Sequence, residues 1–310
     1  MMRGALSLLR NTFILAALGC VSMAFGQFGG RANEVVLYVI NTKGSPVPQI
    51  VPATTANTAT GFTTVDPAKV TPVPFGPDFP GEFFVPLHIE GSDNFRFIIQ
   101  KENIVTQHNV FLGPGKLLIV EGIDRLLIPN KTPVDLTAGL YAPFPQGVDF
   151  GPEVPEIEAH SFLWTPANVF PLLQPADPNY RSPIVPPGLT GSEYVLSIGS
   201  FDALIPWVGF YQTYPNAGWP QGIDARTIES DSALGATVRM IRLRPGKTTP
   251  AFKIGANTHL AVLSGSVQII PSGGGTPVTL KANQYAFIPN GFAVSLSNPI
   301  PYTGPTALPF

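Results

Sequence analysis

The sequence predicts an all-β fold made of two similar barrels or sandwiches in tandem, and three observations support this. The 310-residue chain contains 31 glycines and 35 prolines, about one residue in five, which suits short strands joined by turns better than long helices. Apolar residues form short runs separated by turn formers roughly every ten positions, as in sandwiches and barrels. A segment in the first half also resembles one in the second half, a whole domain away.

The composition excludes some broad classes of protein. Hydrophobic residues make up 44% of the chain, which is enough to build a core and argues against wholesale disorder. Charged residues make up only 12%, where an ordinary soluble domain carries about 25%. Because 18 basic residues nearly balance 20 acidic ones and no basic block stands out, we expect no nucleic-acid partner.

Residues 1–26 are predicted to be a secretory signal peptide. Arg3 and Arg10 supply positive charge, residues 12–21 are apolar, and small residues suit cleavage after Ala24 or Gly26. The apolar stretch is shorter than the ~20 residues that span a bilayer, so we expect no membrane span after cleavage. The predicted location is secreted or periplasmic, and a lipoprotein anchored through Cys20, the only cysteine, is the alternative.

An internal repeat indicates duplication of a domain. Gly122 precedes Gly265 by 143 positions, and Leu136 and Tyr141 precede Leu280 and Tyr285 by 144. A period of this length is typical of two domains and not of a solenoid. In the second copy, residues 267–270 and 277–280 flank a glycine-rich turn and predict a hairpin. Residues 285–288 and 293–296 are predicted as two further strands.

The repeat also suggests domain boundaries. Residues 143–187 contain eleven prolines, which favour an extended connection because proline fixes φ and lacks a backbone donor. The acidic residues Glu153, Glu156 and Glu158 begin this segment, and we expect them to be solvated. The predicted division is a signal peptide (1–26), an N-terminal barrel with irregular loops (27–155), a proline-rich connection (156–190) and a C-terminal barrel (191–310).

Two patterns in the C-terminal copy follow a recognisable spacing. The first runs Gly246, five residues, Phe252-x-Ile254, three residues, Thr258, six residues and Gly265. The second runs Asn283, five residues, Pro289-x-Gly291, two residues, Val294, three residues and Asn298. In this spacing the copy resembles a cupin, a double-sheet jelly-roll-like barrel. The N-terminal copy matches at Gly139, Pro145 and Gly147, so the resemblance implies a two-cupin protein.

The resemblance also identifies the positions where metal-binding cupins carry three histidines and one glutamate. In the C-terminal copy these positions hold Phe252, Ile254, Thr258 and Val294. A register shifted by one residue would substitute Ala251 and Lys253. In the N-terminal copy the first two positions hold Asn109 and Phe111, or His108 and Val110 in the shifted register. The other two positions hold Gly115 and Phe150. Since a divalent first-row metal needs several imidazole or carboxylate ligands, we expect no metal and no other cofactor.

Six residues are candidates for binding a ligand: His108, Lys253, Trp207, Tyr211, Tyr214 and Trp219. One register directs His108 and Lys253 into the barrels, and aromatic side chains on Gly/Pro-rich loops can stack on sugars and other flat ligands. Each candidate also has an ordinary interpretation. His108 would lie in a surface turn, Lys253 on the outside of a strand, and the aromatic residues in a core. Strand alternation turns His259 to the face opposite Thr258.

The sequence therefore predicts a secreted two-cupin protein that binds a small molecule or carbohydrate or has a structural role; oligomerisation is left open. The alternative is a metal-independent enzyme of the sugar isomerase or epimerase kind, which needs an acid–base pair inside a barrel. No catalytic residue is assigned, because the common signatures of hydrolases, zinc proteases and phosphate-binding loops are absent from the sequence. The inward-facing side chains would distinguish the two functions.

Overall fold

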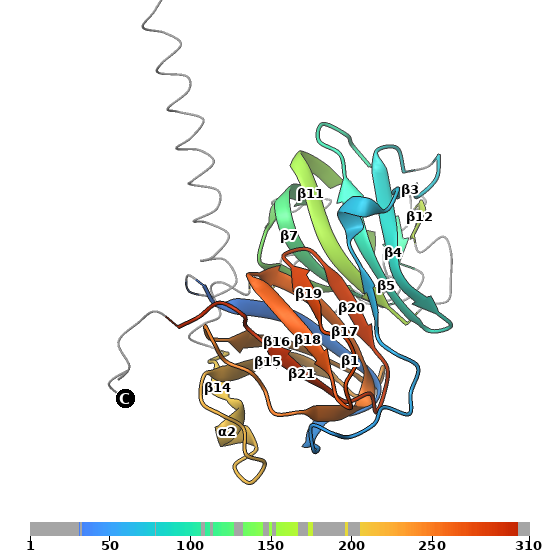
Figure 1. The fold of residues 1–310 in the computed structure, drawn as a ribbon. Helices are drawn as coiled ribbons and strands as arrows, with labels where there is room; N and C mark the ends of the chain where they lie inside the picture. Colours follow the sequence, from blue (N-terminus) through green and yellow to red (C-terminus); the bar gives the residue numbers. More distant parts are fainter. Residues whose placement is uncertain are drawn as a thin grey trace, which may run out of the picture.

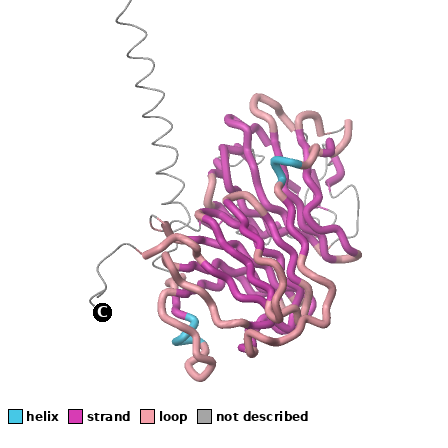
Figure 2. The backbone as a smooth tube through the Cα atoms, in the orientation of Figure 1, coloured by secondary structure: helices cyan, strands magenta, loops and turns pink. Residues whose placement is uncertain are grey.

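The computed structural model describes residues 31, 33–77, 79–106, 109–111, 114–126, 133–144, 149–150, 153–166, 173–175, 196–197 and 205–302. The predicted signal segment, Cys20 and His108 lie outside these residues. Within them, no helix has both the length and the apolar character needed to cross a membrane. Strands dominate the described chain (Figure 2), and helical turns occur only at Pro67–Lys69 and at α2 (Phe210–Thr213).

Two large antiparallel sheets form the molecule (Figure 1). In the C-terminal sheet the strand order is β14 (Val208–Gly209), β15 (Ile223–Asp231), β16 (Ala236–Leu243), β1 (Val35–Ile50), β17 (Phe252–Ser264), β21 (Val294–Ser297), β18 (Ser266–Pro271) and β19 (Val278–Lys281). In this sheet β20 (Tyr285–Ile288) pairs with β17, and β2 (Thr63–Val65) pairs with β20.

The N-terminal sheet follows a similar plan. Its order is β13 (Leu196–Ser197), β9 (Leu140–Phe144), β7 (Gly115–Leu126), β11 (Glu153–Thr165), β5 (Asp93–Gln100), β4 (Glu82–Glu90) and β3 (Val73–Pro74), with β8 (Val134–Thr137) paired to β7. A small third sheet contains β10 (Asp149–Phe150), β6 (Asn109–Phe111) and β12 (Leu173–Pro175). The predicted all-β class with two double-sheet barrels is confirmed.

The strand registers repeat between the two barrels. Asn109 pairs with Phe150 in the first barrel, and Phe252 pairs with Val294 at the equivalent place in the second. The two hairpin strands β8 and β19 are likewise offset by the 144 residues of the sequence repeat. The duplication read from the sequence is therefore a duplication of structure.

Gly122 and Gly265 show why the repeat retains a glycine at this point. Their φ angles are 80° and 77°, in the region that favours glycine. A Cβ at Gly122 would lie 2.0 Å from the carbonyl oxygen of Glu158, and one at Gly265 would lie 2.8 Å from that of Glu34. Each glycine thus allows another segment of the same polypeptide to approach closely. This segment is β11 in the first barrel and the residue before β1 in the second.

The strand pairing differs from the expected domain division at two places. β11 lies between β5 and β7 in the N-terminal sheet, although most of it falls in the segment predicted as a proline-rich connection. β1 takes the equivalent place between β16 and β17, in the sheet of the C-terminal barrel. The chain's first strand therefore completes its last barrel. Residues 35–40 are buried on both faces, which indicates a central strand but does not identify its neighbours.

Three apolar clusters hold the fold together. One fills the C-terminal barrel, one fills the N-terminal barrel, and the third lies between the two large sheets. β1 contributes to two of them, since Leu37 and Val39 face the C-terminal barrel whereas Tyr38 and Ile40 face the other sheet. Because adjacent side chains of a strand point to opposite faces, β1 joins barrel packing to packing between the sheets.

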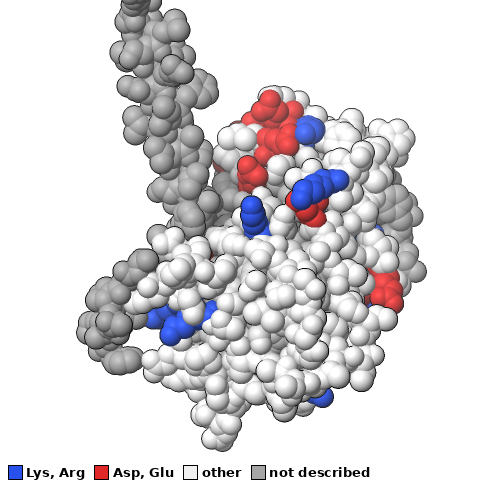
Figure 3. Space-filling view, viewed as in Figure 1, with Lys and Arg blue, Asp and Glu red and all other residues white. Residues whose placement is uncertain are grey.

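The surface reflects the small share of charged residues. In the view of Figure 3, acidic side chains gather over the upper part of the molecule, which the N-terminal sheet forms. The lower part, formed by the C-terminal sheet, shows few charged side chains on this face.

Candidate functional site

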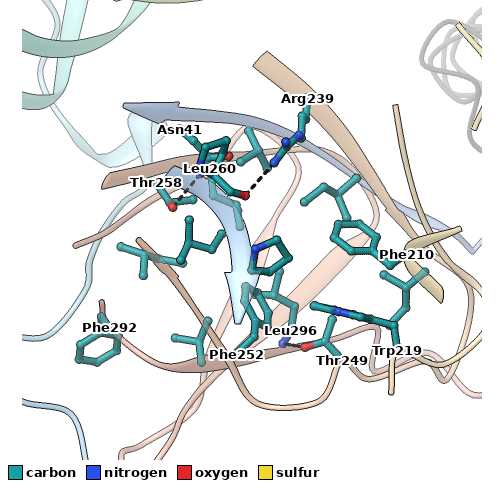
Figure 4. Close-up of a pocket in the computed structure, with 18 of the residues that line it drawn as sticks. Asn41, Phe210, Trp219, Arg239, Thr249, Phe252, Thr258, Leu260, Phe292 and Leu296 are labelled. Carbon is teal, nitrogen blue, oxygen red and sulfur yellow. Dashed lines mark hydrogen bonds between the residues drawn. The ribbon is translucent and has the colours of Figure 1, made fainter. Parts of the chain in front are cut away.

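The four positions that correspond to cupin metal ligands converge on one cavity in the C-terminal barrel. Phe252, Ile254 and Thr258 line it from β17, and Val294 lines it from β21. Figure 4 labels Phe252 and Thr258 among the lining residues. The cavity is small, about 40 Å³, because core side chains occupy most of the interior. Phe252 is 6% exposed, Thr258 4% and Val294 1%.

The chemistry of these side chains does not fit a divalent metal. Phe252, Ile254 and Val294 offer no lone pair. The hydroxyl of Thr258 accepts a hydrogen bond from Asn41 Nδ2 at 2.9 Å and is already engaged. Among the residues that the structure describes, no group of three or more His, Cys, Asp or Glu side chains could hold a metal ion.

Trp219 and Phe210 close one side of the cavity. The Trp219 ring lies 4.7 Å from that of Phe210 and 5.3 Å from that of Phe252, measured between centroids. Trp219 is 5% exposed, and its indole Nε1 is buried without a hydrogen-bond partner. An unpaired buried donor is costly, so a polar group entering the cavity would find an available hydrogen bond there.

The other predicted ligand-binding residues have different surroundings. Trp207 packs against the guanidinium groups of Arg226 and Arg242, whose Cζ atoms each lie 4.6 Å from the ring centroid. Tyr211 is 36% exposed and does not line the cavity. Lys253 follows Phe252 on β17, pairs with Gln49 across the ladder and also stays outside the cavity. His108 lies outside the described residues.

A larger groove of about 340 Å³ adjoins the cavity. One wall is the segment 205–214, which carries β14 and α2, and includes Phe210 and Tyr214. The opposite wall is the inner face of β15 and β16, with Ala225, Thr227 and Arg239. Phe210 and Arg239 line both the groove and the cavity, so these two side chains form a border that the two spaces share.

Arg239 is the basic side chain at this junction, and the sequence reasoning did not select it. Its Nη1 donates to the carbonyl of Pro46 at 3.0 Å, and its Nε donates to Thr227 Oγ1 at 3.4 Å. Burial lowers the pKa of Arg239, opposed by the nearby Tyr214. The sequence contained a pattern that could have identified Arg239. The internal repeat pairs it with Arg96, and each of the two arginines lies between apolar neighbours in the sequence.

The N-terminal barrel contains a buried group of carboxyls. Glu82, Asp124 and Glu153 are all buried, with Glu153 accepting a hydrogen bond from Gln100 Nε2 at 2.9 Å. Burial raises the pKa of Glu82 to about 8 and that of Asp124 to about 7. The pKa of Glu153 is also raised, by burial and by the neighbouring carboxyls. The expectation that Glu153 is solvated is wrong, because β11 carries it into the barrel.

Polar side chains also join the two large sheets. His259 faces away from Thr258, as strand alternation predicts, and its Nε2 lies 2.7 Å from Asp93 Oδ1 of the other sheet. At a second place, Lys116 Nζ pairs with Glu229 and with Asp231 across the same interface. These contacts bridge the sheets and lie outside both the cavity and the groove.

Comparison with solved structures shows the fold. A candidate dioxygenase from Nostoc punctiforme superposes with a TM-score of 0.58 at 12% identity, covering 78% of this chain and 79% of that one. Salicylate 1,2-dioxygenase from Pseudaminobacter salicylatoxidans gives 0.52 at 13% identity, with 72% and 75% covered. A deletion mutant of oxalate decarboxylase from Bacillus subtilis gives 0.51 at 11% identity, with 79% and 75% covered. No family model and no curated protein matches the sequence.

Proposed function

We infer that this chain, which has the cupin fold in two copies, is a binding protein for a small molecule and does not use a divalent metal. The ligand site we propose is the groove and cavity at the mouth of the C-terminal barrel. Export through the predicted signal peptide is part of the proposal, and would place the site outside the cytoplasm.

The observation that supports this site is that the groove and the cavity lie side by side and share Phe210 and Arg239 as lining residues. Small-molecule sites are concave and mostly apolar, with a few polar groups that orient the ligand. The groove volume of about 340 Å³ lies within the usual range of ~300–1,000 Å³ for such sites. Phe210 and Tyr214 supply aromatic surface, and Trp219 Nε1 supplies an unused donor at depth.

The alternative function, metal-independent isomerisation or epimerisation, requires a positioned acid and base. Of the described residues that line the groove and cavity, the titratable ones are Arg226, Arg239 and Tyr214. Arginine keeps its proton at ordinary pH, so Tyr214 is the one described lining residue able to transfer a proton, and the described lining gives it no partner for an acid–base pair. The buried carboxyls of the N-terminal barrel are the observation that favours the alternative, since strongly shifted pKa values also occur at catalytic sites.

Titration with the neutral fluorescent probe N-phenyl-1-naphthylamine tests the proposed site. We expect its emission to rise on binding to the parent protein, and Ala225→Phe to abolish this rise because the new ring fills the groove. Ala233→Phe is the matched control, since Ala233 lies in an exposed turn outside the groove. Equal binding by parent and Ala225→Phe, or no binding by the parent, would contradict the proposal.

A further inference from the structure

We propose that the groove selects ligands that carry a carboxylate, and that Arg239 binds this carboxylate while an apolar tail lies between the two walls. This inference deepens the proposed function and rests on it. It assigns a specificity-determining role to a residue that the cupin motifs do not include.

The first argument is the unbalanced charge of Arg239. Its hydrogen-bond partners are a backbone carbonyl and a hydroxyl, both neutral. No acidic side chain of the described residues pairs with it. A partly buried guanidinium without a counter-charge is unfavourable, and an anionic ligand would supply the missing charge.

The nearby acidic side chains are engaged elsewhere. On β15, Asp224 pairs with Arg242 at 2.7 Å, and Glu229 and Asp231 pair with Lys116 of the other sheet. From the opposite wall, the titratable group facing Arg239 is the phenol of Tyr214. Among the described residues, no Asp or Glu side chain lines the groove or the cavity beside Arg239.

The second argument is the geometry of the guanidinium. Nε and Nη1 are used by Thr227 and Pro46, whereas Nη2 has no protein partner and is not among the fully buried unpaired atoms. Arg239 lines both spaces, and Figure 4 shows it reaching toward the cavity from its edge. A carboxylate in the groove can accept from this free edge, and such charge-assisted bonds are the stronger ones.

The third argument concerns the remainder of the ligand. The rings of Phe210 and Tyr214 lie 5.7 Å apart, measured between centroids, along one wall. Ala225 and Ile205 add apolar surface. A flat or short aliphatic tail fits this surface, so the ligand class is a small monocarboxylic acid with an apolar body.

Isothermal titration with two matched probes tests the inference. These are 3-phenylpropanoate and its neutral amide, which have the same shape but differ in charge. We expect the parent protein to bind the acid at least ~10-fold more tightly than the amide, with an affinity for the acid that falls as salt is added. Arg239→Gln should remove this preference and leave amide binding within about two-fold of the parent.

Two further variants complete the test. Arg239→Lys keeps the positive charge but not the planar fork, so the preference for the acid should be smaller but still present. Arg244→Gln is the matched control, because Arg244 follows the same strand outside groove and cavity, and it should behave like the parent. If acid and amide bind the parent equally, the inference is overturned while the proposed site stands. Failure of the naphthylamine probe as well would instead reject the site itself.

Discussion

Asp93 Oδ1 lies 2.7 Å from His259 Nε2, and the two fully buried side chains come from opposite sheets. Asp93 accepts three further hydrogen bonds, from Trp164 Nε1, Thr42 Oγ1 and Asn257 Nδ2. Burial alone would raise the pKa of Asp93, but the hydrogen bond and charge of His259 hold it well below its usual range. A single carboxylate thus binds groups from both barrels and fixes how the sheets meet.

Replacing this carboxylate should weaken the whole molecule. Asp93→Asn removes the charge and replaces one acceptor oxygen with an NH2 group that faces buried donors, so we expect a loss of about 3–5 kcal/mol in the free energy of unfolding. Urea denaturation measures the loss. Asp135→Asn, which breaks an exposed pair with Arg125, should stay close to the parent. A small effect at Asp93 would mean that the apolar cluster and the Lys116 ion pairs hold the sheets together without it.

The buried carboxyls of the N-terminal barrel predict a loss of stability as the pH rises from about 4.5 to about 8. Because folding raises the pKa of Glu82 to about 8, the folded protein binds a proton that the unfolded chain releases above about pH 4.5. Stability should therefore be full in mild acid and fall as pH rises toward 8. Thermal unfolding between pH 5 and 9 measures this slope, which Glu82→Gln should reduce. Glu158→Gln, on the exposed side of β11, should leave the slope unchanged.

The side chains at the positions that match cupin metal ligands should contribute to stability. Phe252 packs against Trp219 inside the C-terminal barrel, and Phe252→Ala should cost about 3–5 kcal/mol because it leaves a cavity. Val294→His should also destabilise the fold, since it buries an imidazole without a partner. Chemical unfolding measures both, with Lys253→Ala as the control on the opposite face of β17. If Phe252→Ala kept the stability of the parent but no longer bound the naphthylamine probe, Phe252 would line a water-filled ligand site.

The position of β1 predicts that the C-terminal barrel does not fold without the first strand. Removal of β1 takes Val35, Leu37 and Val39 out of the barrel core and leaves β16 and β17 unpaired on their facing edges. A fragment of residues 205–310 should lack a cooperative thermal transition. Adding a peptide of residues 31–52 should restore one. A fragment that unfolds cooperatively by itself would show that β1 is dispensable.

Local patterns predicted the second barrel in detail. The hairpin expected from residues 267–270 and 277–280 is β18 and β19, and the next two strands are β20 and β21. Here the turn residues and the alternation of apolar positions are local in sequence, so a linear pattern contains the information. The repeat supported the interpretation, because the same turns recur about 144 residues earlier.

Long-range pairing could not be read in this way. Residues 35–40 of β1 are apolar on both faces, which indicates a central strand without naming its neighbours. The first half of β11 is acidic and resembles a solvated segment, although the strand lies between β5 and β7. The roles of Asp93 and Glu82 depend on neighbours that lie far away in the sequence. The role proposed for Arg239 depends on the absence of an acidic partner among the described residues. Their roles follow from burial and charge in the folded molecule, and sequence alone specifies neither.

The central proposal is that the positions matching cupin metal ligands do not coordinate a metal in this protein, and elemental analysis tests it most directly. Protein purified without added metal or chelator should contain well under one equivalent of Mn, Fe, Ni or Zn per chain, because hydrocarbon side chains at Phe252, Ile254 and Val294 cannot replace the water around an ion. A stoichiometric metal content that His108→Ala abolishes would contradict the claim and place a metal centre in the N-terminal barrel.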